Sequence, residues 1–330
     1  MLKKILIYLP CHRDLADAIL QARQLRADFD SHMLAPNSAK WEMEIVMSVN
    51  NFLPNEKLKH EAELFCNEVY YYGENLLADV NISEGFLIAL RKNPDIFWIL
   101  SANDDLVAGA LSIILNQFEE DPNLDLLVAS ELSESRHLRE REILQGGLSG
   151  LHLGLISGVI YRTLKMRPYF NVAPFFPWTG WSQLAVIYSA VLGEEYLSIK
   201  SIPRQNLFVL DKKDTGSIGT LYTHSYFGGL IHELLYKKSK IARRKIIWNF
   251  VYKNFYLHHL FNSRDKKYRG EALITSDHYL DWNRIIAESL IRSEAPITYY
   301  VYRLISQIPF EKCQKNRYLQ KLRSYVRDIN

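Results

Sequence analysis

Cysteine is scarce in this chain, and its few cysteines exclude a domain built on a structural zinc site and one built on a framework of disulfides. The 330 residues contain three cysteines, Cys11, Cys66 and Cys313, which are scattered along the sequence. None of them has the close spacing of a structural zinc site. Their number suits a reducing cytosol and provides no disulfide framework.

Long apolar runs and a large excess of charge are also missing. No stretch approaches the roughly 18 uninterrupted apolar residues of a membrane-spanning helix. The apolar residues 5–9 are too few for a signal peptide, and Pro10 and polar residues follow at once. The formal net charge is +3, which does not by itself indicate nucleic-acid binding. We therefore expect a cytoplasmic, globular protein.

Short apolar segments alternate with amphipathic ones in the first half of the chain. Such alternation predicts βαβ units and an α/β fold with a mostly parallel sheet flanked by helices. The expected strands are residues 5–9, 31–35, 68–72, 96–100 and 124–129, and the expected helices are 15–27, 42–51, 82–92 and 108–118. Further on, we expect a helix at 182–192 and strands at 196–202 and 206–210.

The character of the chain changes twice. Residues 130–150 are rich in charge and end in Gly-Gly-Leu-Ser-Gly, which indicates a loop outside the sheet. From about Leu221 the pattern is helical, aromatic and basic, so we divide the chain into domains 1–215 and 216–330. The basic, aromatic segment favours contact with an anionic membrane surface, or else forms a helical subdomain with a solvated basic rim. No nucleic-acid-binding motif accompanies it.

Two adjacent carboxylates, Asp104 and Asp105, follow the apolar and aromatic residues 96–100. Apolar runs of this kind are typical of buried parallel strands, whose carboxyl ends build ligand sites in α/β sheets. Two carboxylates there suit a hard divalent cation that also binds phosphate oxygens. The alternative is a solvated turn before the next helix, where acidic residues suit the helix dipole.

Four segments, taken in order, resemble the family 2 glycosyltransferases with the GT-A fold, of the type found in bacterial capsule and O-antigen gene sets. They are residues 9–13 after the first strand, 34–38 after the expected second strand, 72–85 with Asn81 and Gly85, and 96–105, which matches the family's aspartate motif. The resemblance covers roughly residues 1–210.

The resemblance implies a nucleotide-sugar donor and a divalent cation, Mn²⁺ or Mg²⁺, that neutralises the departing diphosphate. Asp105 would hold the metal, with His224 as a further metal-site candidate. Asp104 would contact the ribose or assist the metal, which places it among the catalytic and the donor-binding candidates. The remaining donor-binding candidates are Pro10, His12, Arg13, Asn37, Ser38, Asn75 and Asn103.

The acceptor half departs from the family. The family commonly places an acidic pair near residues 176–183, but no Asp or Glu occurs between Asn171 and Val191. Inverting transfer needs a base near the acceptor hydroxyl, and we favour Glu131, which follows the fifth strand; Glu134, His152 and His224 remain alternatives. The acceptor-binding candidates are Trp178, Trp181 and Gln183, although both tryptophans could equally be core residues.

These observations lead to one main hypothesis and two competitors. The main one is a metal-dependent glycosyltransferase of surface polysaccharide synthesis, with a lipid-linked glycan acceptor and a location in the cytoplasm or on the inner face of the cell membrane. The second is a weakly active or inactive partner with the same fold in a polysaccharide assembly complex. The third, a nucleotidyltransferase, needs a Gly-rich loop after the first strand, and residues 10–16 contain no glycine.

Overall fold

The computed structural model describes an N-terminal α/β unit. The described residues are 2–11, 15–35, 40–50, 52–74, 76, 78–102, 104–130, 134–139, 153, 156–176 and 182–209, together with 292, 300, 303 and 304. They belong mainly to the first of two compact units of the chain, which comprises residues 1–142, 148–177 and 182–213. Nearly all of residues 216–330 lie outside the described residues, so the second domain stays a prediction.

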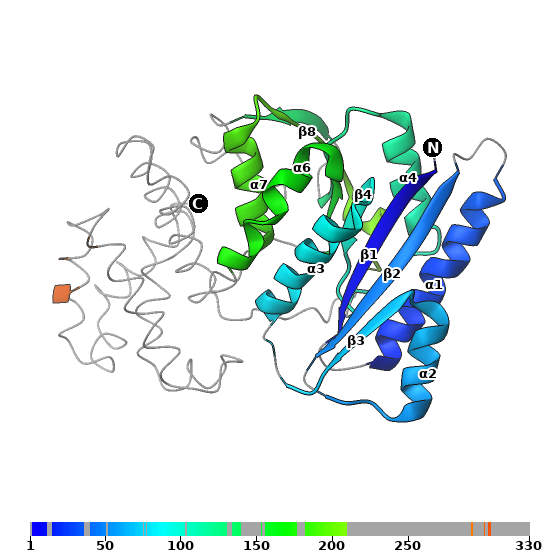
Figure 1. The fold of residues 1–330 in the computed structure, drawn as a ribbon. Coiled ribbons are helices and arrows are strands. Elements are labelled where there is room, and N and C mark those ends of the chain that lie inside the picture. Colours follow the sequence, from blue (N-terminus) through cyan, green and yellow to red (C-terminus); the bar gives the residue numbers. More distant parts are fainter. Residues whose placement is uncertain are drawn as a thin grey trace, which may run out of the picture. The chain divides into compact units, whose positions relative to one another are not determined.

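An eight-stranded sheet in the order β3-β2-β1-β4-β7-β5-β8-β6 forms the centre of this unit. Figure 1 shows β2 between β1 and β3 in this sheet. The strands are β1 (Lys3–Cys11), β2 (Trp41–Asn50), β3 (Glu68–Tyr72), β4 (Ile96–Ile99), β5 (Leu126–Ser130), β6 (Glu134–Leu138), β7 (Val159–Arg162) and β8 (Leu197–Pro203). Strands β7 and β6 run antiparallel to their neighbours, and the other six run in one direction. The predicted mostly parallel α/β fold is confirmed.

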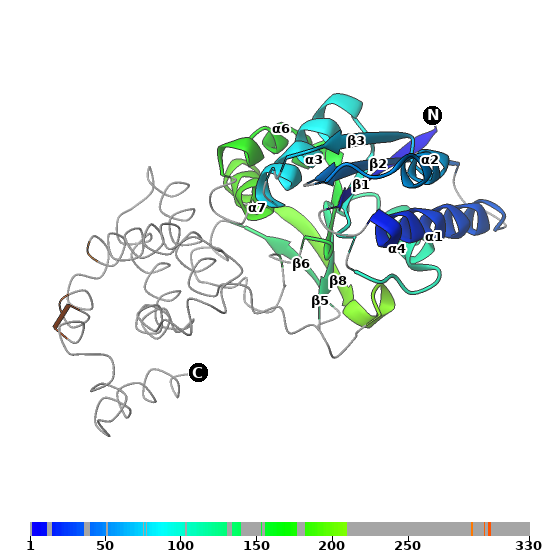
Figure 2. The same ribbon diagram turned by 90° about the horizontal axis from the view of Figure 1, so that it is seen from below.

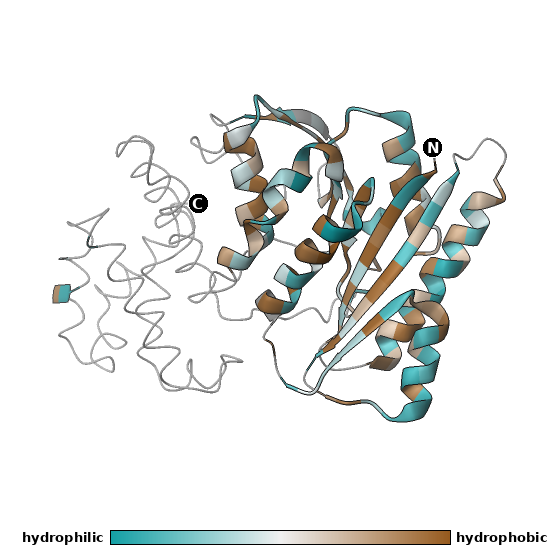
Figure 3. Cartoon of the chain, in the orientation of Figure 1, coloured by the Kyte–Doolittle hydropathy of each residue, from teal (hydrophilic) through white to brown (hydrophobic). Residues whose placement is uncertain are grey.

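Helices cover both faces of the sheet (Figure 2). One face packs against α1 (Leu15–Met33), α2 (Glu56–Phe65) and α4 (Ala110–Glu120), and the other against α3 (Ala78–Lys92), α6 (Thr163–Phe170) and α7 (Ser182–Gly193). Short 3-10 turns occur at η1 (Ala173–Phe175) and η3 (Arg204–Asn206). Because helices cover the central strands on both faces, these strands have apolar residues at consecutive positions rather than at alternating ones. Figure 3 shows this on β1, which is hydrophobic along most of its length.

The two faces of the sheet have different cores. Ile5, Ile7 and Leu9 of β1 belong to the aliphatic core on the side of α1 and α4. On the side of α3, four buried aromatic rings pack with centroids 5.3–6.0 Å apart: Phe86, Phe97, Tyr161 and Phe170. Ring pairs at these distances stabilise the fold beyond the effect of burying their apolar area, so this cluster joins α3 and α6 firmly to β4 and β7.

Two predicted elements are wrong. Residues 31–35, expected as a strand, continue helix α1 as far as Met33, and residues 42–51, expected as a helix, form strand β2. The segment Trp41–Asn50 contains Glu and Met, which favour helices, but β2 pairs along its whole length with β1 and in its second half with β3. Tertiary pairing thus overrides local propensity here.

Two smaller expectations also need correction, and one helix was missed. Residues 206–210, expected as a strand, contribute only an isolated bridge between Leu106 and Phe208. The charged segment 130–150, expected as a loop, includes the edge strand β6, which pairs with β8. Helix α2 was not expected at all. Its first residues are polar, and Asn55 caps it by accepting a hydrogen bond from the backbone N–H of Leu58.

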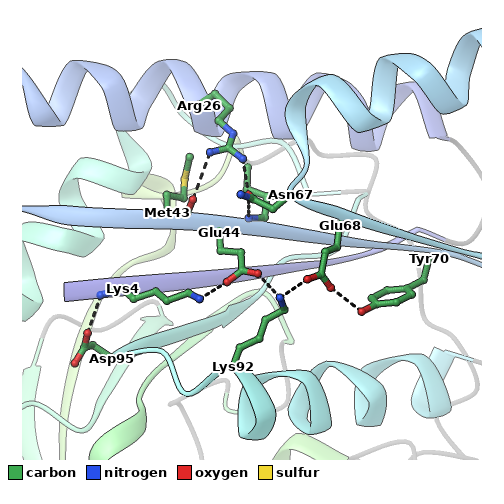
Figure 4. A network of polar contacts seen from close by, with 10 residues as sticks. Lys4, Arg26, Met43, Glu44, Asn67, Glu68, Tyr70, Lys92 and Asp95 are labelled. Atoms are coloured by element: carbon green, nitrogen blue, oxygen red, sulfur yellow. Dashed lines mark hydrogen bonds and ion pairs between the residues drawn. The ribbon is translucent and has the colours of Figure 1, made fainter. Parts of the chain in front are cut away.

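A charged network closes the amino-terminal edge of the sheet (Figure 4). Lys92, the last residue of α3, forms ion pairs with Glu44 of β2 and Glu68 of β3, and Lys4 of β1 also pairs with Glu44. Burial alone would raise the pKa of Glu44, but the hydrogen bonds from the two lysines outweigh it and lower that pKa. The network binds the end of α3 to three strands and lies opposite to the edge where α/β sheets bind ligands.

Candidate functional site

The order in which the chain adds strands to the sheet reverses between β1 and β4. From β1 the chain builds β2 and β3 on one side, and then crosses to β4 on the other side. Open α/β sheets bind ligands outside the carboxyl ends of the strands at such a switch point. Pro10, near the end of β1, is half-buried there, and residues 100–105 follow β4 at the same place. The structure therefore brings the predicted residues Pro10, Asp104 and Asp105 to this edge.

Asp104 is partly buried, and its carboxylate is held by Ser157. The Ser157 hydroxyl donates to Asp104 Oδ2 at 2.5 Å and accepts from the backbone N–H of Ser101 at 2.8 Å. Ser157 lies just before β7, and because β7 is antiparallel its amino end is at the carboxyl edge of the other strands. The indole N–H of Trp98 donates to the Ser157 carbonyl at 2.8 Å, which places Ser157 in turn.

Asp105 has a fixed backbone and an exposed side chain. Its carbonyl accepts from the N–H of Val209 at 2.9 Å, and the N–H of Val107 donates to the Leu207 carbonyl at 3.0 Å. The segment after β8 thus holds this loop like a short added strand. Since the Asp105 side chain is exposed, its carboxylate is accessible to a ligand in solvent.

The two carboxylates fit a cation that takes only part of its ligands from protein. Within the described residues, no group of three or more His, Cys, Asp or Glu side chains could hold a metal ion. Mg²⁺ commonly binds through one or two carboxylates and completes its shell with water and substrate phosphates, and two adjacent aspartates suit that mode. Asn103 and His224, the other candidates for this region, lie outside the described residues.

Asn50, at the carboxyl end of β2, was missed by the sequence analysis. Its Oδ1 accepts from the backbone N–H of Leu76 at 2.7 Å, while its Nδ2 is buried with no hydrogen-bond partner in the described structure. Asn37 and Ser38 were expected to follow the second strand, but β2 begins at Trp41, so that reason for choosing them is wrong. They lie outside the described residues. A polar Ser-Val-Asn-Asn after the apolar residues of β2 was the available signal.

A second polar cluster ties β1, β2 and β3 to α3, and on β2 the Ser48 hydroxyl donates to Glu84 Oε2 at 3.4 Å. The Tyr8 hydroxyl donates to Asn81 Oδ1 at 2.5 Å and lies 3.1 Å from Glu84 Oε2, and the Tyr72 hydroxyl also donates to Glu84. Burial, reinforced by the negative charge of Glu84, raises the pKa of Tyr8 well above its usual value. Burial and the hydrogen bond to Glu84 also raise the pKa of Tyr72, so both tyrosines serve as neutral donors and the cluster stabilises the framework of the site.

The other predicted residues are less well placed or are not described. Gln183 lies in the first turn of α7 and is 1% exposed, so it cannot contact an acceptor unless its neighbours move. Glu131 belongs to the short connection between Ser130 of β5 and Glu134 of β6, but is itself outside the described residues. The same applies to His12, Arg13, Asn75, His152, Trp178, Trp181 and the basic aromatic segment after Leu221. Among the described helices, none is long and apolar enough to cross a membrane.

The strand order, with the antiparallel β7 inserted between β4 and β5, defines a GT-A-like fold. A crystal structure of S. aureus TarS 1-349 in complex with UDP-GlcNAc is similar, with a TM-score of 0.54 and 14% sequence identity over 88% of this chain and 81% of that chain. A mannosyltransferase from Pyrobaculum calidifontis in complex with GDP-Man and Mn2+ has a TM-score of 0.45 at 11% identity, over 88% of this chain and 86% of that chain. No protein-family model and no curated protein matches. At such identities the comparison establishes the fold alone.

Proposed function

We propose that this protein is a glycosyltransferase that moves a sugar from a nucleoside-diphosphate donor to a glycan acceptor. The observation that carries the proposal is the pair Asp104 and Asp105 at the switch point of a GT-A-like sheet. The fold neighbour TarS was crystallised with UDP-GlcNAc, which agrees with a nucleotide sugar as the donor.

In this proposal the donor half of the site binds the nucleotide sugar and the divalent cation. Asp105 and Asp104 would hold Mn²⁺ or Mg²⁺, which when bound supplies positive charge for the diphosphate of the donor. Ser157 orients the Asp104 carboxylate through its hydroxyl. We add Asn50 to the donor-binding candidates Pro10, His12, Arg13, Asn75 and Asn103, because its buried amide N–H₂ has no acceptor among the described residues at the end of β2.

The acceptor side of the proposal depends on residues next to the second half of the sheet. Glu131 is our candidate for the base that takes the proton of the acceptor hydroxyl, since strands β5 and β6 on either side of it meet the carboxyl edge. Trp178 and Trp181 would stack on sugar rings. The lipid-linked acceptor and the contact of the basic segment with a membrane surface complete the proposal.

Binding of Mn²⁺ together with nucleoside diphosphates tests the core of this function. We expect calorimetry with UDP, GDP, CDP and dTDP to show binding of at least one of them that depends on Mn²⁺. Asp105→Asn removes one carboxylate charge from the site, so it should weaken that binding by about tenfold or more. Asp30→Asn, at an exposed position near the far end of α1, is the matched control and should bind like the unaltered protein.

The same measurements separate the proposal from an inactive partner of a polysaccharide assembly complex. The absence of acidic residues between Asn171 and Val191 favours the partner as the second candidate. A partner protein need not bind a nucleotide with a metal. If the unaltered protein binds none of the four nucleoside diphosphates with Mn²⁺ or Mg²⁺, the transferase proposal is wrong.

A further inference from the structure

Helix α1 presents three polar side chains to the loop that carries the two aspartates. Gln21, Gln24 and Asp28 follow one another at spacings of three and four residues, so they lie along one side of the helix. Gln21 is 6% exposed and Asp28 is 9% exposed. Buried amides and carboxylates cost free energy unless they form hydrogen bonds, so this row of polar groups on a packed helix needs a physical reason.

Gln21 binds both ends of the turn that leads to Asp104. Its Nε2 donates to the carbonyl of Ser101 at 3.1 Å and to the carbonyl of Asp104 at 2.6 Å. The backbone N–H of Asp104 itself donates to the Ser101 carbonyl at 3.1 Å and closes the turn. One side-chain amide therefore joins the first and last residues of this turn.

The other two residues of the row extend the attachment along the loop. Gln24 Nε2 donates to the carbonyl of Leu106 at 3.0 Å, and Asp28 Oδ2 accepts from the N–H of Gly109 at 3.0 Å. The Oε1 of Gln21 is buried without a partner among the described residues, so the position of this amide is set by its two N–H bonds. The row thus holds the backbone of the loop from Ser101 to Gly109.

We propose that Gln21 is a positioning residue for the Asp104–Asp105 site, an inference that rests on the proposed function. Ser157 orients one carboxylate directly, whereas the exposed Asp105 side chain depends on the placement of its backbone. By fixing the turn, Gln21 holds at the sheet edge the backbone that carries both aspartates. A site that is already ordered binds its ligand without a further cost of ordering the loop.

The test compares two substitutions of Gln21 with a matched control. Gln21→Leu removes both N–H donors, and Gln21→Glu keeps the shape of the side chain but brings acceptor oxygens to two carbonyls. Gln117→Leu is the control, because Gln117 of α4 also has a buried Oε1 without a partner, and in the described structure its side chain makes no hydrogen bond to the loop. Gln24→Leu removes a single bond and should give a smaller effect.

Two measurements are made on each protein. Hydrogen exchange followed by mass spectrometry reports on peptides that span residues 100–109, and calorimetry reports the affinity for Mn²⁺ in the presence of the nucleoside diphosphate that binds the unaltered protein. Two hydrogen bonds of ordinary net strength correspond to about a tenfold change. We expect both Gln21 variants to exchange about ten times faster in this loop and to bind Mn²⁺ about ten times more weakly, with Gln117→Leu unchanged in both.

The outcomes separate this inference from the proposed function. If exchange in residues 100–109 is the same in both Gln21 variants as in Gln117→Leu, the positioning role is wrong. Faster exchange with unchanged Mn²⁺ affinity also overturns it, because order in the loop would then not matter for the cation. If the unaltered protein binds no Mn²⁺ with any nucleotide, the proposed function fails and the cation role of Gln21 fails with it.

Discussion

Gly85 in helix α3 offers a sharp test of how the site's framework is packed. A Cβ at this position would lie 2.5 Å from Cδ1 and 2.9 Å from Cε1 of Tyr8. Tyr8 is completely buried on the central strand β1, and its hydroxyl is bonded to Asn81 and Glu84 of the same helix. The ring cannot move aside without breaking these bonds, so either α3 or β1 must shift in Gly85→Ala.

The expected change in the free energy of unfolding of Gly85→Ala combines one stabilising effect and two destabilising effects. Alanine is favoured over glycine in a helix interior by about 1 kcal/mol. Overpacking a dense core costs about 1–3 kcal/mol. Loss of the hydrogen bonds of a buried hydroxyl costs about 1–3 kcal/mol more. The balance is a fall of about 3 kcal/mol in the free energy of unfolding, opposite in sign to the effect of helix propensity alone.

Hydrogen exchange of the slowest amides in β1 and α3 measures this change in the α/β unit itself. A loss of about 3 kcal/mol corresponds to exchange that is about a hundredfold faster. Gly73→Ala is the control, since the nearest atoms to an added Cβ would be those of the Leu53 side chain, at 3.6 Å or more, an ordinary contact. If Gly85→Ala is as stable as the unaltered protein or more stable, the close packing of Tyr8 on α3 is refuted.

Two further predictions concern the charged network at the amino-terminal edge. Lys92→Met removes the lysine between Glu44 and Glu68. It should lower the free energy of unfolding by about 2 kcal/mol, which is less than the loss expected for a fully buried ion pair. An unchanged urea midpoint would contradict this prediction. The pKa of Glu44 is lowered from its ordinary value of 4.5, so its stabilising effect is present above that pH and is lost as the pH falls through the folded-state pKa. Unfolding measured between neutral and acid pH should therefore show a smaller pH dependence in Glu44→Gln, and an identical profile would argue against a role for this carboxylate.

Local patterns were sufficient for much of the sheet. The run of apolar residues before Asp104 predicted strand β4 and its place next to an acidic loop, since a strand covered on both faces has few polar residues. The alternation of segments predicted the parallel sheet, whereas the resemblance to the glycosyltransferases assigned Pro10 and Asp104 to one donor site. These inferences need only the order of residues and the fixed geometry of βαβ units.

Pairing between segments far apart in the sequence decided the features that local patterns did not predict. Whether residues 41–50 are helix or strand depends on β1 and β3, and with that choice Asn50 takes the place at the sheet edge that Asn37 and Ser38 were expected to hold. The contact between Gln21 and the turn before Asp104 spans 80 residues or more, and that of Ser157 with Asp104 spans 53. A chain segment shows which groups can bond, but only the packed fold selects the partner, because hydrogen bonds between distant residues depend on where each element is packed.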